Sequence, residues 1–100
     1  MLKKKKVLNH NEDILASISG AAISDVQGIA PLQDEDGGHF QIDISGNDVF
    51  IDVNINAAFG NNIPELAYNI QTKIKKDIER RTRYVVKKVN VNIISVIMPL

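Results

Sequence analysis

Residues 54–71 read Asn-Ile-Asn-Ala-Ala-Phe-Gly-Asn-Asn-Ile-Pro-Glu-Leu-Ala-Tyr-Asn-Ile-Gln, and this stretch decides the fold. A strand ends here, and Gly60 turns the chain. Pro64 suits the first turn of a helix, where its missing N–H would have had no partner, and Asn62 is a candidate N-cap. A basic segment and the alternating run Val-Asn-Val-Asn-Ile at 89–93 follow. The order strand, helix, strand predicts a β-α-β crossover, which should be right-handed.

The crossover helix is predicted to have an apolar side and a basic side. Its apolar residues recur every three or four positions: Ile63, Leu66, Ala67, Ile70, Ile74 and Ile78. At about 100° per residue, four cations fall along one flank, here called the basic flank: Lys73, Lys76, Arg80 and Arg83. The basic flank is either a solvated surface that suits the helix dipole or a stripe that faces phosphates or an acidic partner. Arg81 points towards the apolar side, so we expect the helix to fray over 81–84.

A first helix and a hairpin precede the crossover. The helix is expected to follow the plausible cap Asn11 and to stop at Gly28. Its core-facing residues should repeat every four positions, as Ile14, Ile18, Ala22 and Val26, with Leu15, Ala21 and Ile29 beside them. The hairpin is predicted to join His39–Ile44 to Val49–Ile55 through the turn residues 45–48. Its register should pair Ile44 with Val49 and Ile42 with Ile51 on one face, and Asp43 with Phe50 and Gln41 with Asp52 on the other. The last strand is predicted over 85–97, and its alternation fails after Ile93.

The predicted fold class is α+β. The order α-β-β-α-β gives a two-layer sandwich, with a three-stranded mixed sheet and two helices packed on one face. Residues 1–6 are expected to be a basic tail and residues 7–100 a single domain. The other face of the sheet, here called the open face, should be polar and available to water or a partner. It would carry His39, Gln41, Asp43, Phe50, Asp52, Asn54, Asn56, Lys88, Asn90 and Asn92, with Ile94 and Val96 at one end. Our candidate partner-binding residues are the basic flank together with Phe50, Asn54, Asn90, Asn92, Ile94 and Val96.

The net charge is zero, but the charges are strongly segregated. Lys3 to Lys6 are all basic, residues 7–72 carry ten acids and no Lys or Arg, and residues 73–88 carry eight bases and two acids. If this segregation persists in space, it favours head-to-tail or antiparallel self-association.

The residues make no case for an enzyme or for a bound cofactor. There is no Cys, which removes disulfides, thiolate metal sites and thiol nucleophiles. His10 and His39 have no catalytic partner in the pattern, and Asp43 and Asp52 sit diagonally across the hairpin, which disfavours a coupled acid–base pair. The acidic loop at 33–38 lacks the spacing of a calcium site, so we predict a plain solvated loop and no metal. Residues 60–63 could hold an anion at a helix start but match no nucleotide-binding motif.

No membrane-spanning segment or signal peptide is predicted. The longest apolar run, 93–100, is broken by Ser95 and Pro99 and is too short to span a bilayer. The four N-terminal lysines lead straight into polar residues, so we read them as a solvated tail. The alternative is a weak contact of these lysines with anionic lipid.

The chain resembles the alkaline shock protein family over nearly all of residues 7–98. The resemblance rests on Phe59–Gln71, Ile74-Lys75 and Val89–Ile93. The family shows an aromatic-Gly-x-x-Ile-Pro-acidic turn, an amphipathic helix, a Thr near its end and a Val-Asn-Val strand. Thr82 fits the Thr position, and residues 14–29 look like the family's first helix and its ending. The chain departs from the pattern with Phe59 for the usual Tyr, Arg83 for the Gly after Thr82, and without the long charged tails.

The resemblance implies a non-enzymatic, self-associating protein. Members are small, mostly cytosolic proteins of Gram-positive bacteria and relatives, linked to the cell envelope and its stress response, and held near the membrane through a membrane-anchored partner. We therefore expect a cytoplasmic scaffold or homo-oligomer, peripheral to the membrane through such a partner.

The alternative function is a KH-like module that binds nucleic acid through the basic flank. Against it, the chain has no Gly-x-x-Gly loop, and the open face carries acids and little aromatic surface beyond Phe50.

Overall fold

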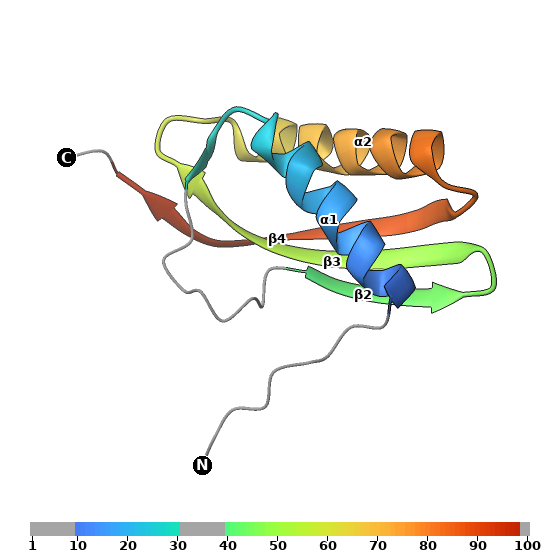
Figure 1. Cartoon of the computed structure of the whole chain (residues 1–100). Coiled ribbons are helices and arrows are strands. Elements are labelled where there is room, and N and C mark those ends of the chain that lie inside the picture. Colours follow the sequence, from blue (N-terminus) through green and yellow to red (C-terminus); the bar gives the residue numbers. More distant parts are fainter. Residues whose placement is uncertain (1–9, 31–39, 99–100) are drawn as a thin grey trace, which may run out of the picture.

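The computed structural model describes residues 10–30 and 40–98, which form two layers (Figure 1). The elements, in chain order, are α1 (His10–Ser24), β1 (Ile29–Ala30), β2 (Phe40–Ser45), β3 (Asp48–Ala58), α2 (Ile63–Arg81) and β4 (Val85–Ile97). Both helices lie on the same face of the sheet, as predicted. The predicted basic tail at residues 1–6 and the acidic loop at 33–38, including His39 beyond it, lie outside the described residues.

The sheet is mixed and is built around β3. β4 runs parallel to β3 along its whole length on one side, while β2 and β1 pair antiparallel with successive parts of its other side. This arrangement confirms the α+β sandwich and the mixed sheet. The predicted strand count was wrong, because the sheet has four strands. The additional strand, β1, pairs Ile29 with Ala57 and Ala30 with Asn56.

The hairpin has the predicted register. Ile44 pairs with Val49, Ile42 with Ile51 and Asp43 with Phe50. Gly46 at the tip has a φ of 62°, the left-handed conformation that this tight turn requires. The register places alternate residues of β3 in the core, including Ile51 and Val53.

The first helix differs from its prediction in its bounds and in its buried face. It starts at His10 and ends at Ser24, before Gly28, which instead makes a turn with a φ of 99°. Ile18, Ala22 and Leu15 are buried as predicted. Ile14 is 42% exposed and lies outside the core, whereas Ser19 is fully buried. The reason is geometric, because a strict four-residue repeat drifts around a helix that turns every 3.6 residues.

The turn into α2 is formed by residues of the motif on which the family resemblance rests. Gly60 has a φ of 96°, and the Nδ2 of Asn61 donates to the carbonyl of Ala58 at 2.9 Å. The Oδ1 of Asn62 accepts from the N–H of Glu65 at 3.0 Å, which confirms the predicted N-cap. Pro64 occupies the first turn. These residues fix where α2 begins and how it leaves β3.

The last turn of α2 is closed by Thr82. Its N–H and its Oγ1 both donate to the carbonyl of Ile78, at 2.9 and 2.8 Å, and its Oγ1 accepts from the N–H of Tyr84 at 3.1 Å. The helix therefore ends at Arg81, within the stretch where fraying was expected. Arg81 itself is exposed.

Two irregularities in β4 change which residues face the open side. The register with β3 shifts at Lys87 and again at Ile94, each of which is an extra residue in β4. After the second shift, Ser95 lies opposite Asn56 and Ile97 lies opposite Ala58. Val96 pairs with the buried Ala57, so its predicted place on the open face is corrected to the other side.

Candidate interaction surfaces

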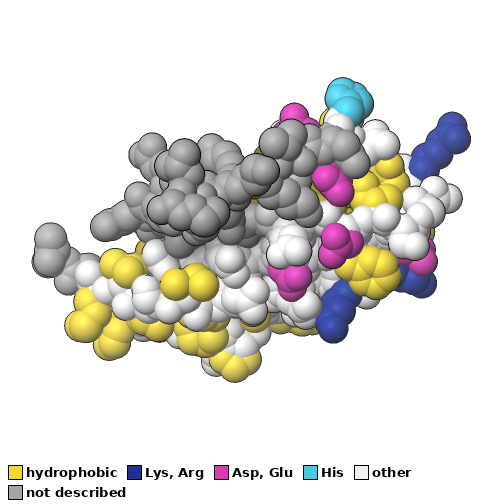
Figure 2. Space-filling view, turned by 90° about the horizontal axis from the view of Figure 1, so that it is seen from below, with side chains coloured by type: hydrophobic (Ala, Val, Ile, Leu, Met, Phe, Trp, Pro, Cys, Tyr) yellow, Lys and Arg dark blue, Asp and Glu magenta, His cyan; other side chains and the backbone are white. Residues whose placement is uncertain are grey.

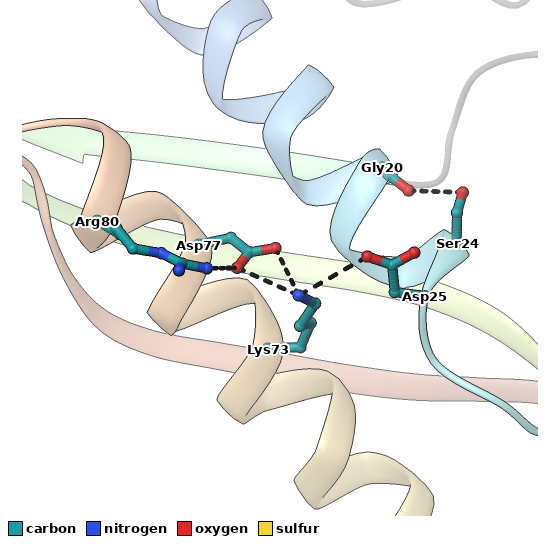
Figure 3. Close-up of polar contacts among 6 residues, drawn as sticks. All are labelled: Gly20, Ser24, Asp25, Lys73, Asp77 and Arg80. Carbon is teal, nitrogen blue, oxygen red and sulfur yellow. Dashed lines mark hydrogen bonds and ion pairs between the residues drawn. The ribbon is translucent and has the colours of Figure 1, made fainter.

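The basic flank of α2 is interrupted by a buried acid, Asp77. The Nζ of Lys73 lies 3.2 Å from the Oδ2 of Asp77, and the Nη2 of Arg80 lies 3.4 Å from its Oδ1. Lys73 also lies 3.7 Å from the Oδ2 of Asp25, which follows the end of α1 (Figure 3). One ammonium group therefore joins the two helices, and two of the four predicted flank cations are partly neutralised.

The Asp77 carboxyl remains ionised in this setting. Burial raises its pKa, but the hydrogen bond and charge of Lys73, followed by those of Arg80, outweigh burial and hold the pKa below its ordinary value. The side chain of Asp77 is only 7% exposed. An uncompensated charge at such a site would be costly, so Asp77 and Lys73 form a structural pair.

The other two cations of the basic flank remain available. Lys76 and Arg83 are exposed, and no ion pair joins either of them to another described residue. The flank thus offers fewer unpaired charges than its sequence indicated.

A row of polar side chains on α2 covers the first half of the outer edge of β4. Gln71, Lys75 and Glu79 follow at four-residue spacing, so they lie on one side of the helix. The Nε2 of Gln71 donates to the carbonyl of Val89 at 3.0 Å, and the Nζ of Lys75 donates to that of Val86 at 3.1 Å. The Oε2 of Glu79 accepts from the N–H of Val86 at 2.8 Å. The backbone groups of β4 that point away from β3 are satisfied at these positions.

The hydrogen bonds to Glu79 also change its acidity. Lys75 lies 2.8 Å from its Oε2, and this hydrogen bond, followed by that from the N–H of Val86, lowers the pKa of the carboxyl below its ordinary value. Glu79 is therefore ionised when it accepts the backbone N–H of Val86 at the outer edge of β4. An open groove of about 320 Å³ runs along this contact, lined by Gln71, Lys75, Val86, Lys87, Lys88, Val89 and Asn90.

The open face of the sheet carries a ladder of hydrogen bonds between β4 and β3. The Nδ2 of Asn90 donates to Asp52 at 2.8 Å, and the Nδ2 of Asn92 donates to Asn54 at 3.0 Å. The third rung joins Ser95 to Asn56 at 3.2 Å. Because these side chains bind one another, the face is polar and ordered, with much of its hydrogen-bonding capacity already used.

Large apolar side chains are exposed where β3 and β4 end. This surface, here called the apolar end, consists of Phe59, Ile94, Val96, Ile97 and Met98, which are 40–63% exposed. The N–H of Phe59 donates to the carbonyl of Ile97 at 2.9 Å, which joins the turn after β3 to the end of β4. Figure 2, seen from the open side, shows hydrophobic side chains gathered at the left, the end to which β4 runs, and lysines and arginines at the opposite end.

The predicted site residues outside the basic flank fall into two groups. Asn54, Asn90 and Asn92 lie in the ladder of the open face, and Phe50, 40% exposed, lies on the same face opposite Lys88. Ile94 and Val96 belong to the apolar end. Sequence reasoning missed the role of Asp77, although its spacing from Lys73 and Arg80 pointed to it. It also missed the capping row Gln71, Lys75 and Glu79, whose four-residue spacing was the available signal.

Among residues 10–30 and 40–98, no cluster of three or more His, Cys, Asp or Glu side chains could hold a metal ion. Neither helix in this part of the chain is both long and apolar enough to cross a membrane.

Comparison with known families settles the resemblance. The model of the alkaline shock protein 23 family, described as having a cell envelope-related function, matches residues 2–98. The chain belongs to this family. Its motif at 59–71 thus has a structural meaning here: the alkaline shock protein turn sets the left-handed Gly60, the Asn62 cap and the start of α2. A search of curated proteins found no match.

Solved structures of similar fold carry the name MamM CTD. The D249A and H264A form has a TM-score of 0.66 at 15% identity, over 92% of this chain and 99% of that one. The manganese form of the E289D variant has a TM-score of 0.59 at 20% identity, over 93% and 89%. At this identity the likeness shows the fold alone.

Proposed function

We propose that this protein is a non-enzymatic, cell-envelope-related stress or homeostasis protein that self-associates or docks on a membrane-anchored partner. The proposal rests on family membership and on one observation of this chain, the exposed apolar end. Contiguous exposed apolar side chains at a sheet end are typical of a surface that another protein covers. The proposed location is cytoplasmic, peripheral to the membrane through the partner.

No observation favours the alternative of a nucleic-acid-binding module. Lys73 and Arg80 are engaged by Asp77, and the open face carries Asp43 and Asp52, whose negative charges would repel phosphates. Two unpaired flank cations, Lys76 and Arg83, would supply only a weak, salt-sensitive attraction.

The test is a crosslinked pull-down of the tagged full chain from its native cells, with co-purified proteins and RNA quantified together. A recurrent membrane protein with little RNA supports docking, and recovery of the chain itself at stoichiometric amounts supports self-association. Abundant RNA that survives moderate salt would overturn the proposal. The matched control is the Lys76→Gln, Arg83→Gln double variant, which should leave protein recovery unchanged because the proposed contact is apolar.

A further inference from the structure

The outer edge of β4 is covered over its first half only. The capping row on α2 reaches Val86 and Val89, and towards the helix start the same row continues as Ala67 and Ile63. Neither of these side chains has a hydrogen-bonding group. The two-residue period of a strand points the backbone groups of Val91 and Ile93 the same way as those of Val89. The extra residue Ile94 shifts this alternation: the carbonyl of Ile97 accepts from the N–H of Phe59, so beyond Ile94 it is Val96 that points outward. β4 pairs only with β3 among the described residues, so from Val91 onward this edge has no strand beside it.

The uncovered half also lacks the features that usually protect an edge. Lysines on an edge strand discourage pairing with another chain, and β4 has two, Lys87 and Lys88, both in its covered half. Residues 89–100 carry no charge at all. Over this stretch the exposed side chains are large and apolar: Ile94 at 59%, Val96 at 47%, Ile97 at 40% and Met98 at 63%.

We propose that the uncovered half of β4, residues 91–97, pairs antiparallel with the same segment of a second copy, so that the two sheets continue into one across a two-fold axis between Ile94 and Ser95, with Ile93 of each copy opposite Val96 of the other. This inference rests on the proposed function, since it names the surface and the partner of the self-association. A strand is the occupant that satisfies both the outward backbone groups and the apolar side chains, whereas a helix would satisfy only the side chains.

Charge selects a second copy, and it selects this register. In an antiparallel pair that sets Ile93 opposite Val96, Lys88 of each copy lies beyond the last residues of the strand in the other copy. The two Lys88 residues are then about 40 Å apart, at roughly 3.3 Å per residue, several times the Debye length of about 8 Å. A pair centred on the covered half would bring the lysines of the two copies face to face. The uncharged segment is therefore the part of β4 that can pair with itself without like-charge repulsion.

The first experiment compares the oligomeric state of two charge variants by sedimentation velocity over a concentration series. We expect Ile94→Lys with Val96→Lys to raise the dimer dissociation constant at least about tenfold, because lysines would be desolvated within the paired strands. Val85→Lys is the matched control, since Val85 is 42% exposed on the covered half of the same strand. It should leave the dissociation constant unchanged. Circular dichroism checks that both variants are folded.

A cysteine scan tests the register without disturbing the charge. The chain has no cysteine, so each variant carries a single thiol. Under mild oxidation Ile94→Cys should form a disulfide-linked dimer, because the two copies of a residue next to an antiparallel axis lie within disulfide range. Val85→Cys lies nine residues away, which separates the two thiols by about 60 Å, and it should not crosslink.

Several results would overturn the inference. If the dimer persists in the Ile94→Lys, Val96→Lys variant, or if it crosslinks through Val85→Cys and not through Ile94→Cys, then it forms through another surface. In that case the protein still self-associates, but not in this register. A chain that is monomeric at every concentration also overturns the inference. The pull-down would still test whether the protein docks on a membrane-anchored partner. Failure of this inference can therefore be told apart from failure of the proposed function.

Discussion

Replacing Asp77 by Asn tests whether this buried carboxylate stabilises the fold by holding Lys73, whose ammonium group joins α1 and α2. The substitution keeps the shape of the side chain and removes its charge. Lys73 would lose a partner at 3.2 Å and keep only Asp25 at 3.7 Å, a side chain that is 69% exposed just after the end of α1. We expect the junction between α1 and α2 to loosen and the free energy of unfolding to fall.

The size of the effect follows from distance and exposure. At 3.2 Å and an effective dielectric constant near 20, the attraction between Lys73 and Asp77 is about 5 kcal/mol before any cost is counted. Most of this is offset by the desolvation of Asp77 and by the ordering of the lysine, whose side chain is 31% exposed. Arg80 is 63% exposed and adds at most about 0.5 kcal/mol. The net loss for Asp77→Asn should be about 1–2 kcal/mol.

The loss should depend on pH in a defined direction. The pKa of Asp77 is lowered in the folded protein, so the carboxylate stabilises the fold fully above its unfolded pKa of about 3.9. This contribution is lost as the pH falls through the folded pKa. The stability of the wild type and of Asp77→Asn should therefore differ at neutral pH and converge at acidic pH.

The assay is urea unfolding followed by circular dichroism, at pH 7 and through the acidic range. A double-mutant cycle with Lys73→Gln should give a coupling of about 1 kcal/mol, while the same cycle with Arg80→Gln, the more exposed partner, should give less than about 0.5 kcal/mol. A variant as stable as the wild type at pH 7, or a difference that persists at low pH, would refute the reasoning.

Two further substitutions test single contacts by the same unfolding assay. The hydroxyl of Ser19 is buried with no hydrogen-bond partner among the described residues, so Ser19→Ala should raise stability by about 1 kcal/mol, and by more than Ser17→Ala on the exposed side of α1. A loss of stability would mean that the hydroxyl has a partner. Asn62→Ala should cost about 1 kcal/mol through loss of the N-cap, whereas the exposed control Asn69→Ala should be neutral or stabilising. Equal effects of these two changes would contradict the capping role.

The parts of the fold that a periodic pattern encodes could be predicted from the sequence. The alternation around residues 45–48 set the hairpin register, and the bounds of β4 were predicted as Val85–Ile97, as observed. β1 is two residues long, which is too short to show a period. The extra residue Lys87 in β4 was also missed, because a single inserted residue leaves no period of its own. The failed alternation after Ile93 marked the second irregularity but did not show that Ile94 is an extra residue, which moves every later side chain to the other face.

The candidate surfaces were predicted less well than the fold, because pairing between side chains is a property of the assembled layers. A helical projection placed the four cations on one flank but gave Asp77 no role, since it could not show how deeply the acid is buried. Likewise, the spacing of Gln71, Lys75 and Glu79 was visible, but their target is the backbone of β4, which side-chain patterns do not describe. The open face was correctly expected to be polar, while its internal ladder requires the register of two strands.

The apolar side chains that remain exposed on β4 also determine how stable the proposed dimer can be. Fully burying a large apolar side chain contributes about 2 kcal/mol, so covering the exposed parts of Ile94, Val96, Ile97 and Met98 would contribute about 4 kcal/mol per copy. A two-fold interface buries these apolar side chains on both copies, so the free energy gained is doubled. A partner without matching apolar groups would bury only those of this chain. Association costs roughly 4–15 kcal/mol, so the apolar contribution alone leaves the dimer near balance, and the backbone hydrogen bonds of the paired strands decide its stability.

Such an interface has no charges to screen, and its dissociation constant should change little with salt. Attraction through Lys76 and Arg83 would weaken steeply, which makes ionic strength a simple way to tell the two surfaces apart.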